Sequence, residues 1–462
     1  MSNEFSCVHN EMIFTVAPND FPRLMEELRS EWMKDYNVVS EDTKKDMVQT
    51  LEDINLDLGS YLVRWNLQRP EDVKSLSQDE LENEINWNYQ LLMCWAGQDR
   101  VNSLKKESES ICRSNLMALT KSSANGDLNT YWGNDYASKL RWAMRRGGIL
   151  ATTNPQLVNT ARKEEPEVWD PIKERLCKEH SGSNPEELGA AMTVEVILKN
   201  AWEMRPIYEA SGGRFGYISL QVSPKNSYDS EGMITEALKI YDLLSQTMDC
   251  TPNVIFKVPA TAAGIPVAKE LTSKGIGVNI TVNFALAQQL AFADVIESGK
   301  AKVSFLTEMN GRLDDPVAKE LESLGVADAK EVSTWAGVAV TRRAYSMLYS
   351  EKGYSRSSLL VASLRGPWHI ERSLGDGPVP LYITVFPDKA LQYDEEPRSL
   401  KPVIDEDIPV DVLRKLKKSK LFMQAYEPDG LKPEEFDSFG PVDKTLKSFN
   451  EGYDDFLKYL TS

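Results

Sequence analysis

Short apolar segments alternate with helical patterns along this chain from about residue 149 to residue 386. Strands separated by helices form parallel sheets, and about eight such units in roughly 250–300 residues favour a closed barrel over an open sheet. The predicted fold class is therefore α/β, a (β/α)8 TIM barrel. The strands are expected at 149–153, 216–222, around Lys257, 278–282, 302–307, 358–363 and 380–386.

The segment before the barrel has a different pattern. Residues 1–125 are acidic, with apolar residues at helical spacing in 21–32 and 79–95, and predict an additional N-terminal helical domain of unknown role. This domain could pack on the barrel, cover its mouth or form a homodimer. The Ser/Asn/Gly stretch 121–126 is typical of a linker.

The barrel domain is expected to span 126–462. Within it, residues 387–436 are polar and contain several prolines, so they are interpreted as an insertion with one basic helix at 410–423. Residues 442–460 have apolar residues at helical spacing and predict a C-terminal helix.

Charge and cysteine usage exclude several classes of function. The net charge of −17 at pH 7 argues against nucleic acid or an anionic membrane as a partner, so an anionic substrate would need local arginines. The five cysteines are scattered and include no CxxC pair, which favours reduced thiols. No signal peptide is visible, and the apolar runs are shorter than the roughly 18 residues of a membrane span. A cytoplasmic location is expected.

Lys257 lies inside an apolar run that resembles a buried strand. A buried ammonium loses its proton more readily, and a neutral amine on a rigid strand is a nucleophile for carbonyl groups. A Schiff-base enzyme is one interpretation, and a strand-end lysine that extends its amine to solvent is the other. Polar residues that share a strand face favour the first interpretation, namely Ser219 with Gln221, Asn279 with Thr281, and Ser363 with Arg365.

Five motifs occur in the order and near the spacing found in the transaldolase family. They are Ala151-Thr152-Thr153-Asn154-Pro155, Phe256-Lys257-Val258-Pro259-Ala260-Thr261, Asn279-Ile280-Thr281, Gly311-Arg312-Leu313-Asp314 and Ala362-Ser363-Leu364-Arg365. The chain resembles that family from about residue 132 to its C-terminus, and the first 125 residues are not covered. The resemblance implies a β/α barrel whose lysine forms a Schiff base with a ketose phosphate.

The resemblance also implies a role for each matching residue. Lys257 would be the nucleophile, and Asp135 would be the acid/base that handles the C4 hydroxyl of the sugar. Thr153, Asn154 and Asn279 would lie at the dihydroxyacetone unit, and Thr281 would position the catalytic water. The phosphate would be bound by Arg312, Ser363 and Arg365, whose guanidinium groups suit an anion. Local alternatives are a solvated turn for Asp135, capping for the asparagines and surface ion pairing for the arginines.

Two positions depart from the transaldolase pattern. Gln221 stands where transaldolases carry a glutamate that works with the catalytic water, and fructose-6-phosphate aldolases have a glutamine there. A glutamine can hold a water molecule but cannot exchange a proton at neutral pH. Met309 stands where an aromatic residue usually precedes the arginine of the fourth motif. Both departures make simple aldol cleavage more credible.

The resulting hypothesis is a transferase that moves a three-carbon dihydroxyacetone unit from a ketose donor to an aldose phosphate acceptor. The first alternative is cleavage resembling that of fructose-6-phosphate aldolase, or a transaldolase homologue of specialised metabolism. The second is a non-catalytic sugar-phosphate-binding protein. No organic cofactor is expected, because the lysine imine would supply the electron sink. No metal is expected either, since His9, His180 and His369 are far apart and no HExxH motif occurs.

Overall fold

The computed structural model describes residues 4–69 and 76–462. Within these residues, eight parallel strands close into one barrel in the order β1 to β8. This arrangement confirms the predicted TIM barrel. The strands are β1 Thr130–Asn134, β2 Leu150–Thr152, β3 Tyr217–Gln221, β4 Val254–Pro259, β5 Val278–Thr281, β6 Phe305–Glu308, β7 Ser358–Val361 and β8 Leu381–Val385.

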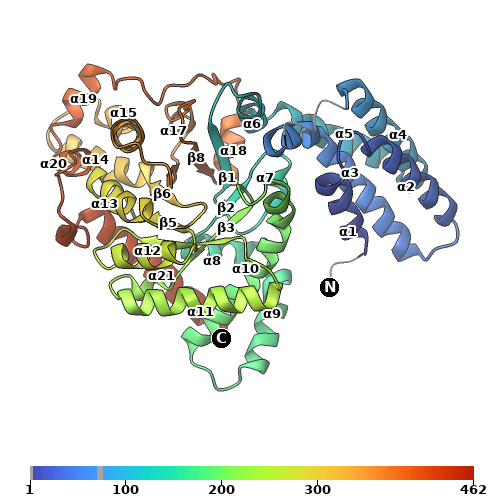
Figure 1. Cartoon of the computed structure of the whole chain (residues 1–462), viewed down its shortest axis with the longest axis horizontal. Coiled ribbons are helices and arrows are strands. Elements are labelled where there is room, and N and C mark those ends of the chain that lie inside the picture. Colours follow the sequence, from blue (N-terminus) through green and yellow to red (C-terminus); the bar gives the residue numbers. More distant parts are fainter. Residues whose placement is uncertain (1–3, 70–75) are drawn as a thin grey trace.

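Helices surround the barrel on its outer side (Figure 1). They bury apolar faces against the strands, and the largest core cluster contains residues of both layers, such as Met233 and Leu244 on helices and Phe256 on a strand. The helices are α7 Leu140–Met144, α8 Pro155–Glu164, α9 Pro166–Glu179, α10 Pro185–Ala210, α11 Ser230–Met248, α12 Gly264–Ser273, α13 Leu286–Glu297, α14 Asn310–Ser323, α15 Ala329–Ser333, α16 Ala336–Tyr345, α17 Trp368–Glu371, α18 Pro387–Asp394, α19 Val410–Leu416, α20 Lys420–Tyr426 and α21 Gly440–Thr461.

Several boundaries differ from the sequence expectation. The first strand, β1, was not predicted at all, because its five residues contain an asparagine and a glycine and lack an apolar run. The 302–307 strand instead begins at Phe305. The basic helix at 410–423 is two helices, α19 and α20, separated by a turn at Lys417 that ends before the N-cap Ser419.

The N-terminal segment is helical and lies beside the barrel (Figure 1). Its helices are α1 Glu4–Asn10, η1 Glu11–Thr15, α2 Phe21–Asp35, α3 Glu41–Gln68, α4 Gln78–Ala96, α5 Gln98–Arg113 and α6 Asn115–Asn125. The predicted linker at 121–126 is wrong. Its residues form the last turn of α6, and the helix ends at Gly126, whose φ of +84° is the left-handed conformation typical of a helix end.

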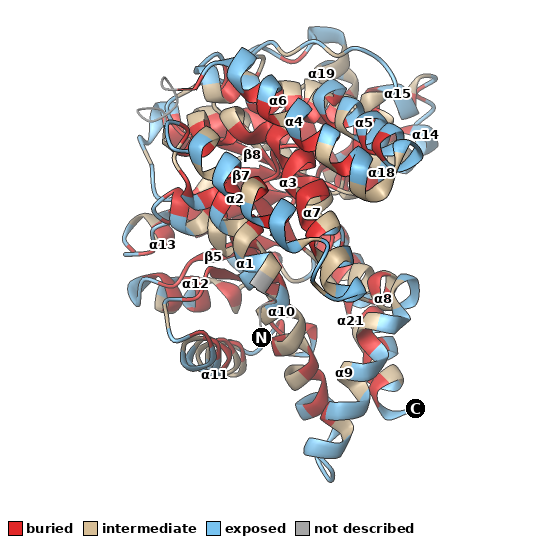
Figure 2. Ribbon diagram, turned by 90° about the vertical axis from the view of Figure 1, so that its right-hand side faces the viewer, coloured by how far each residue is buried: buried red, intermediate tan, exposed pale blue. Residues whose placement is uncertain are grey.

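Helix α3 connects the helical segment to the barrel and is buried along much of its length (Figure 2). Arg145 lies just after α7 and pairs with Asp53 at 2.5 Å and with Asp57 at 3.5 Å, both on α3. Arg214, which lies just before β3, donates to the carbonyl oxygens of Leu67 and Gln68. These contacts lie on segments that precede β2 and β3, so the helical segment packs near the amino ends of the strands and does not cover the barrel mouth.

Candidate active site

Lys257 lies in the fourth strand and its side chain is buried, with 6% of the residue exposed. Its Nζ donates a hydrogen bond of 2.7 Å to the carbonyl oxygen of Thr153, at the end of the second strand. Burial lowers the pKa of Lys257, the negative charge of Asp135 opposes this change, and the positive charge of Arg312 adds to it. The amine is therefore directed toward the end of the second strand. The alternative of an amine extended to solvent does not fit this structure, because Nζ is bonded to a protein carbonyl in a buried position.

Gln221 and Asn279 lie directly beside Lys257 on the two neighbouring strands. Asn279 is fixed in the barrel, since its Nδ2 donates to Ser219 Oγ at 2.9 Å and its Oδ1 accepts from Thr307. The Oε1 atom of Gln221 is buried without a hydrogen-bond partner among the described residues. Because an unpaired buried carbonyl is costly, this atom is available to accept a hydrogen bond from a ligand or water.

Asp135 follows the first strand and is held by a hydrogen bond from its backbone N–H to the carbonyl oxygen of Val385. Its Oδ1 accepts a 2.7 Å hydrogen bond from Thr152 Oγ1. Since Thr152 donates its hydroxyl proton to the carboxylate, the 2.7 Å contact between Thr152 and Thr384 has Thr384 as donor. Two threonines thus orient the carboxylate, and its charge raises the pKa of Lys257. Asp135 is not merely a solvated turn residue.

Asn154 forms the N-cap of α8. Its Oδ1 accepts from the backbone N–H groups of Gln156 and Leu157, both at 3.1 Å. The capping alternative is therefore correct for this oxygen, and only the Nδ2 group remains for a substrate. The Thr153 carbonyl oxygen accepts the hydrogen bond from Lys257 Nζ. The Thr153 hydroxyl is buried without a hydrogen-bond partner among the described residues.

Thr281 ends the fifth strand and is almost fully buried. Its hydroxyl lies 3.9 Å from the sulfur of Met309, the residue found where the related sequences carry an aromatic side chain. A thioether is a weak acceptor, so the threonine hydroxyl has no strong hydrogen-bond partner among the described residues.

Arg312 and Arg365 come together at the ends of the sixth and seventh strands. Burial lowers the pKa of Arg312, and the nearby positive charge of Arg365 lowers it further. Among the described residues, no carboxylate lies within ion-pair distance of Arg312. Gly311 permits this approach, because a Cβ there would lie 2.3 Å from the Ser363 carbonyl oxygen and 2.6 Å from Arg365 Cγ. Two adjacent guanidinium groups, one of them unpaired and mostly buried, are suited to an anion.

Ser363 connects the seventh strand to Arg365 and has a φ of +62°, the left-handed region that is uncommon for a residue with a side chain. Its carbonyl oxygen accepts a 3.1 Å hydrogen bond from Arg365 Nη1. Arg365 also forms a two-pronged pair with Asp315, with contacts of 3.3 and 2.7 Å. The ion-pairing alternative therefore applies to Arg365 but not to Arg312.

A family model gives the decisive comparison. The model described as Transaldolase/Fructose-6-phosphate aldolase matches residues 143–432, which is well over half of the chain. The chain belongs to this family.

Curated transaldolases share the same region. The chain is 28% identical over 236 residues to a transaldolase of Thiobacillus denitrificans, covering 48% of this chain and 64% of the relative. It is 29% identical over 208 residues to transaldolase 1 of Streptomyces avermitilis, covering 43% of this chain and 53% of the relative. The match thus spans less than two thirds of the length of each of these two transaldolases.

Phe449 is a further residue at the site that the sequence analysis missed. It lies on the C-terminal helix α21, and the Arg312 guanidinium carbon is 5.3 Å from the centre of its ring. The same helix is attached to the opposite side of the mouth, because Gln156 donates a 2.6 Å hydrogen bond to the carbonyl oxygen of Ser448. An amphipathic pattern predicts the helix, but nothing in the sequence indicates that it crosses the mouth of a transaldolase-family barrel.

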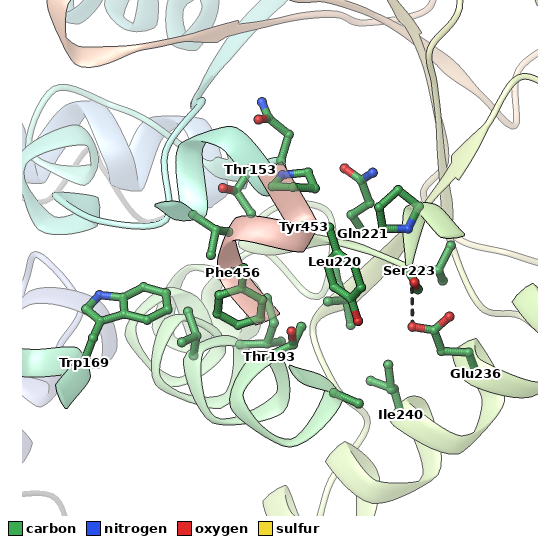
Figure 3. Close-up of a pocket in the computed structure, with 18 residues that line it drawn as sticks. Thr153, Trp169, Thr193, Leu220, Gln221, Ser223, Glu236, Ile240, Tyr453 and Phe456 are labelled. Atoms are coloured by element: carbon green, nitrogen blue, oxygen red, sulfur yellow. Dashed lines mark hydrogen bonds between the residues drawn. The ribbon is translucent and has the colours of Figure 1, made fainter. Parts of the chain in front are cut away.

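An apolar pocket lies between the third strand and the helices α10, α11 and α21, and Thr153, Asn154 and Gln221 of the candidate site also line it (Figure 3). Leu220 on the third strand, Ile240 on α11 and Phe456 on α21 line it, whereas Lys257 does not. Gln221 is at its edge and points away from the apolar part (Figure 3). The chemistry of the site is therefore assigned to the barrel interior and not to this pocket.

Two further findings concern metals and membranes. Within residues 4–69 and 76–462, no cluster of three His, Cys, Asp or Glu side chains could hold a metal ion. None of the described helices is long and apolar enough to cross a membrane.

Proposed function

We propose that the protein is a Schiff-base aldol enzyme that transfers a three-carbon dihydroxyacetone unit from a ketose phosphate to an aldose phosphate. The observation that carries this proposal is the buried amine of Lys257, whose pKa is lowered and whose direct hydrogen-bond partner is a backbone carbonyl. Such an amine is neutral more often than a surface lysine, and only the neutral form attacks a ketone. Membership of the transaldolase family supports the same chemistry.

The reaction begins when Lys257 Nζ attacks the C2 ketone and water leaves, which produces an imine. The Asp135 carboxylate then takes the proton of the C4 hydroxyl, and the C3–C4 bond breaks with its electron pair moving into the imine. An aldose phosphate leaves, and a three-carbon enamine stays on Lys257. The threonine-oriented carboxylate of Asp135 and the fixed amide of Asn279 support these two roles.

The enamine then attacks the aldehyde carbon of the acceptor, and Asp135 returns its proton to the new hydroxyl oxygen. Water, which we place beside Thr281, hydrolyses the imine and frees the lysine. Arg312, Arg365 and Ser363 would bind the phosphate of donor and acceptor in turn. The unpaired charge of Arg312 next to Arg365 is what supports an anion at this point.

Simple aldol cleavage is the second candidate, and Gln221 favours it. A glutamine beside the lysine can hold a water molecule through its unpaired Oε1, but it cannot supply or remove a proton. If the enamine is protonated by water before an acceptor arrives, dihydroxyacetone is released. The balance between the two outcomes is a property of this one position and of acceptor binding.

Borohydride trapping with fructose 6-phosphate tests the proposal. Reduction of the imine would leave a three-carbon adduct, which intact mass measurement and peptide mapping should locate on Lys257. Lys257→Met should abolish the adduct, whereas Lys447→Met, which changes an exposed lysine, should not. Absence of an adduct on the folded wild-type protein with a panel of ketose phosphates would reject the Schiff-base mechanism.

A further inference from the structure

A buried imidazole connects the two segments that carry the arginine pair. His369 is fully buried, and its Nε2 lies 2.8 Å from Asp314 Oδ2. Its Nδ1 lies 3.1 Å from the backbone nitrogen of Arg365. A backbone N–H can only donate, so Nδ1 must be the acceptor and the ring proton must be on Nε2, where it is donated to the carboxylate.

Asp314 is itself fixed at both oxygens. Its Oδ1 accepts a 3.0 Å hydrogen bond from the backbone N–H of Gly337, at the start of α16, and its Oδ2 accepts from His369. Asp314 is two residues beyond Arg312 on α14. The chain of contacts therefore runs from the helix that carries Arg312, through a carboxylate and an imidazole, to the backbone of Arg365.

This chain of contacts can restrain the two segments that carry the arginines. Two guanidinium groups near one another repel, so each segment needs contacts that hold it in place against this repulsion. Arg365 contributes its own side chain to the site, and the restraint acts on its backbone nitrogen. Among the described residues, the Arg365 side chain has only an exposed carboxylate, Asp315, and the Ser363 carbonyl as hydrogen-bond partners. Buried residues must consequently fix the position of the Arg365 backbone.

We infer that His369 and Asp314 are positioning residues that hold the Arg365 backbone where its guanidinium can join Arg312 in binding a phosphate. This inference deepens the proposed function, because it concerns the phosphate half of the same site. In this role neither residue needs to contact the reacting carbons or to transfer a proton. The imidazole links the two segments through Nδ1 as acceptor and Nε2 as donor.

Binding of inorganic phosphate, measured by calorimetry, tests the inference without any turnover. His369→Phe should weaken phosphate binding by about ten-fold, which is the effect of losing roughly one well-formed hydrogen bond. His369→Asn can present an oxygen near the Nδ1 position and should retain most of the affinity. His369→Gln can present a donor near the Nε2 position, but it leaves Arg365 N–H unpaired and should resemble the Phe variant.

The chain offers a matched control. His9 forms another buried pair with a carboxylate, at 2.8 Å from Asp57, in the N-terminal helical segment. His9→Phe should reduce stability without changing phosphate affinity. If His369→Phe does not fold, the comparison of His369→Asn with His369→Gln decides the question, and equal affinities would overturn the inference.

A second measurement distinguishes failure of this inference from failure of the proposed function. Dihydroxyacetone carries no phosphate, so its trapping by borohydride reports on Lys257 alone and should be unchanged in His369→Gln. Wild-type protein that binds no inorganic phosphate, or a His369→Phe variant that binds it normally, would overturn the positioning role. Trapping that fails in the wild type would instead reject the lysine chemistry.

Discussion

Gln221 and Lys257 are registered neighbours on adjacent strands of the barrel, and the glutamine carbonyl oxygen is buried without a partner among the described residues. A carboxylate at this position could exchange protons with a water molecule beside the lysine. Gln221→Glu should therefore raise the ratio of transfer to release of free dihydroxyacetone by about ten-fold or more, since general acid–base groups contribute about 10²–10⁴-fold. The ratio is measured with a ketose phosphate donor in the presence and absence of an aldose phosphate acceptor.

Gln221→Asn is the control for this change, because it alters the side-chain length without adding an exchangeable proton. An unchanged ratio in Gln221→Glu would show that this position does not limit transfer.

The lowered pKa of Lys257 predicts how imine formation depends on pH. Only the neutral amine reacts, so the rate of trapping should rise with pH and reach its half-maximum below the ordinary lysine pKa of about 10.4. The measurement is the initial rate of adduct formation with dihydroxyacetone across the pH range in which the protein stays folded. A half-maximum at or above the ordinary value would contradict the effect assigned to burial.

The same pKa shift has a consequence for stability. Between the folded and unfolded pKa values, the unfolded chain binds the additional proton, so this group makes stability rise with pH. At a pH below the pKa of Lys257 in the folded protein, the lysine is protonated in both states. The full cost of burying the ammonium then lowers the free energy of unfolding. We expect Lys257→Met to be more stable than the wild type near neutral pH, with a difference that narrows as pH rises. Urea unfolding at several pH values measures it, and a difference that widens with pH would have the wrong sign.

Gly311→Ala should disturb the proposed phosphate-binding site formed by Arg312 and Arg365. The new Cβ would lie 2.3 Å from the Ser363 carbonyl oxygen and 2.6 Å from Arg365 Cγ, so the two segments must separate. We expect a loss of about 1–3 kcal/mol in the free energy of unfolding and weaker binding of inorganic phosphate. Gly440→Ala, whose Cβ would meet nothing within 4 Å, is the control. Normal phosphate affinity in Gly311→Ala would argue against Arg312 and Arg365 acting together.

Asp315→Asn should instead strengthen phosphate binding at the site formed by Arg312 and Arg365. The Arg365–Asp315 pair is exposed, with 39% and 49% of the two side chains accessible, so it contributes at most about 1 kcal/mol. Removing the carboxylate frees the guanidinium and should tighten phosphate binding by up to about five-fold at low salt. Asp443→Asn, which removes an exposed partner of Lys447, should have no effect. Weaker binding in Asp315→Asn would mean that Asp315 helps to orient Arg365.

Arg145→Ala tests how the helical segment is attached to the barrel. Arg145 is buried between Asp53 and Asp57 of the third helix, and removing one member of a buried ionic cluster costs about 3–5 kcal/mol. In Arg145→Ala, the rate of amide hydrogen exchange should increase more in α3 than in the barrel strands. Arg113→Ala, which removes an exposed pair with Glu109, is the control, and equal exchange in both variants would show that Arg145 is not the attachment point.

The fold could be predicted from the sequence because it depends on local patterns. Apolar runs such as the one around Lys257 are short and bounded, and the barrel follows from their number and spacing. The first strand was missed, since Thr130–Asn134 lacks an apolar run and owes its place to pairing with the second and eighth strands. Such pairing is a tertiary contact that has no signature within five residues.

The sequence could predict site residues that lie on strands or directly after them. It could not predict residues that distant segments of the chain bring to the site. Strands were expected at Gln221, Lys257 and Asn279, and the register places these three residues side by side. Phe449 reaches Arg312, and His369 reaches Asp314, by contacts between distant parts of the chain, so position in the sequence says nothing about these two contacts. The roles of all these residues in catalysis stay predictions.

The crossing of the mouth by α21 has a consequence for the order in which the protein is completed. Phe449 and Ser448 are synthesised after every strand of the barrel, so a nascent chain can close its sheet while the wall beside Arg312 is still missing. Closure of the barrel and completion of the wall beside Arg312 are thus separate events in the synthesis of the chain. A chain arrested before residue 440 should have Lys257 in place but should lack the wall beside Arg312.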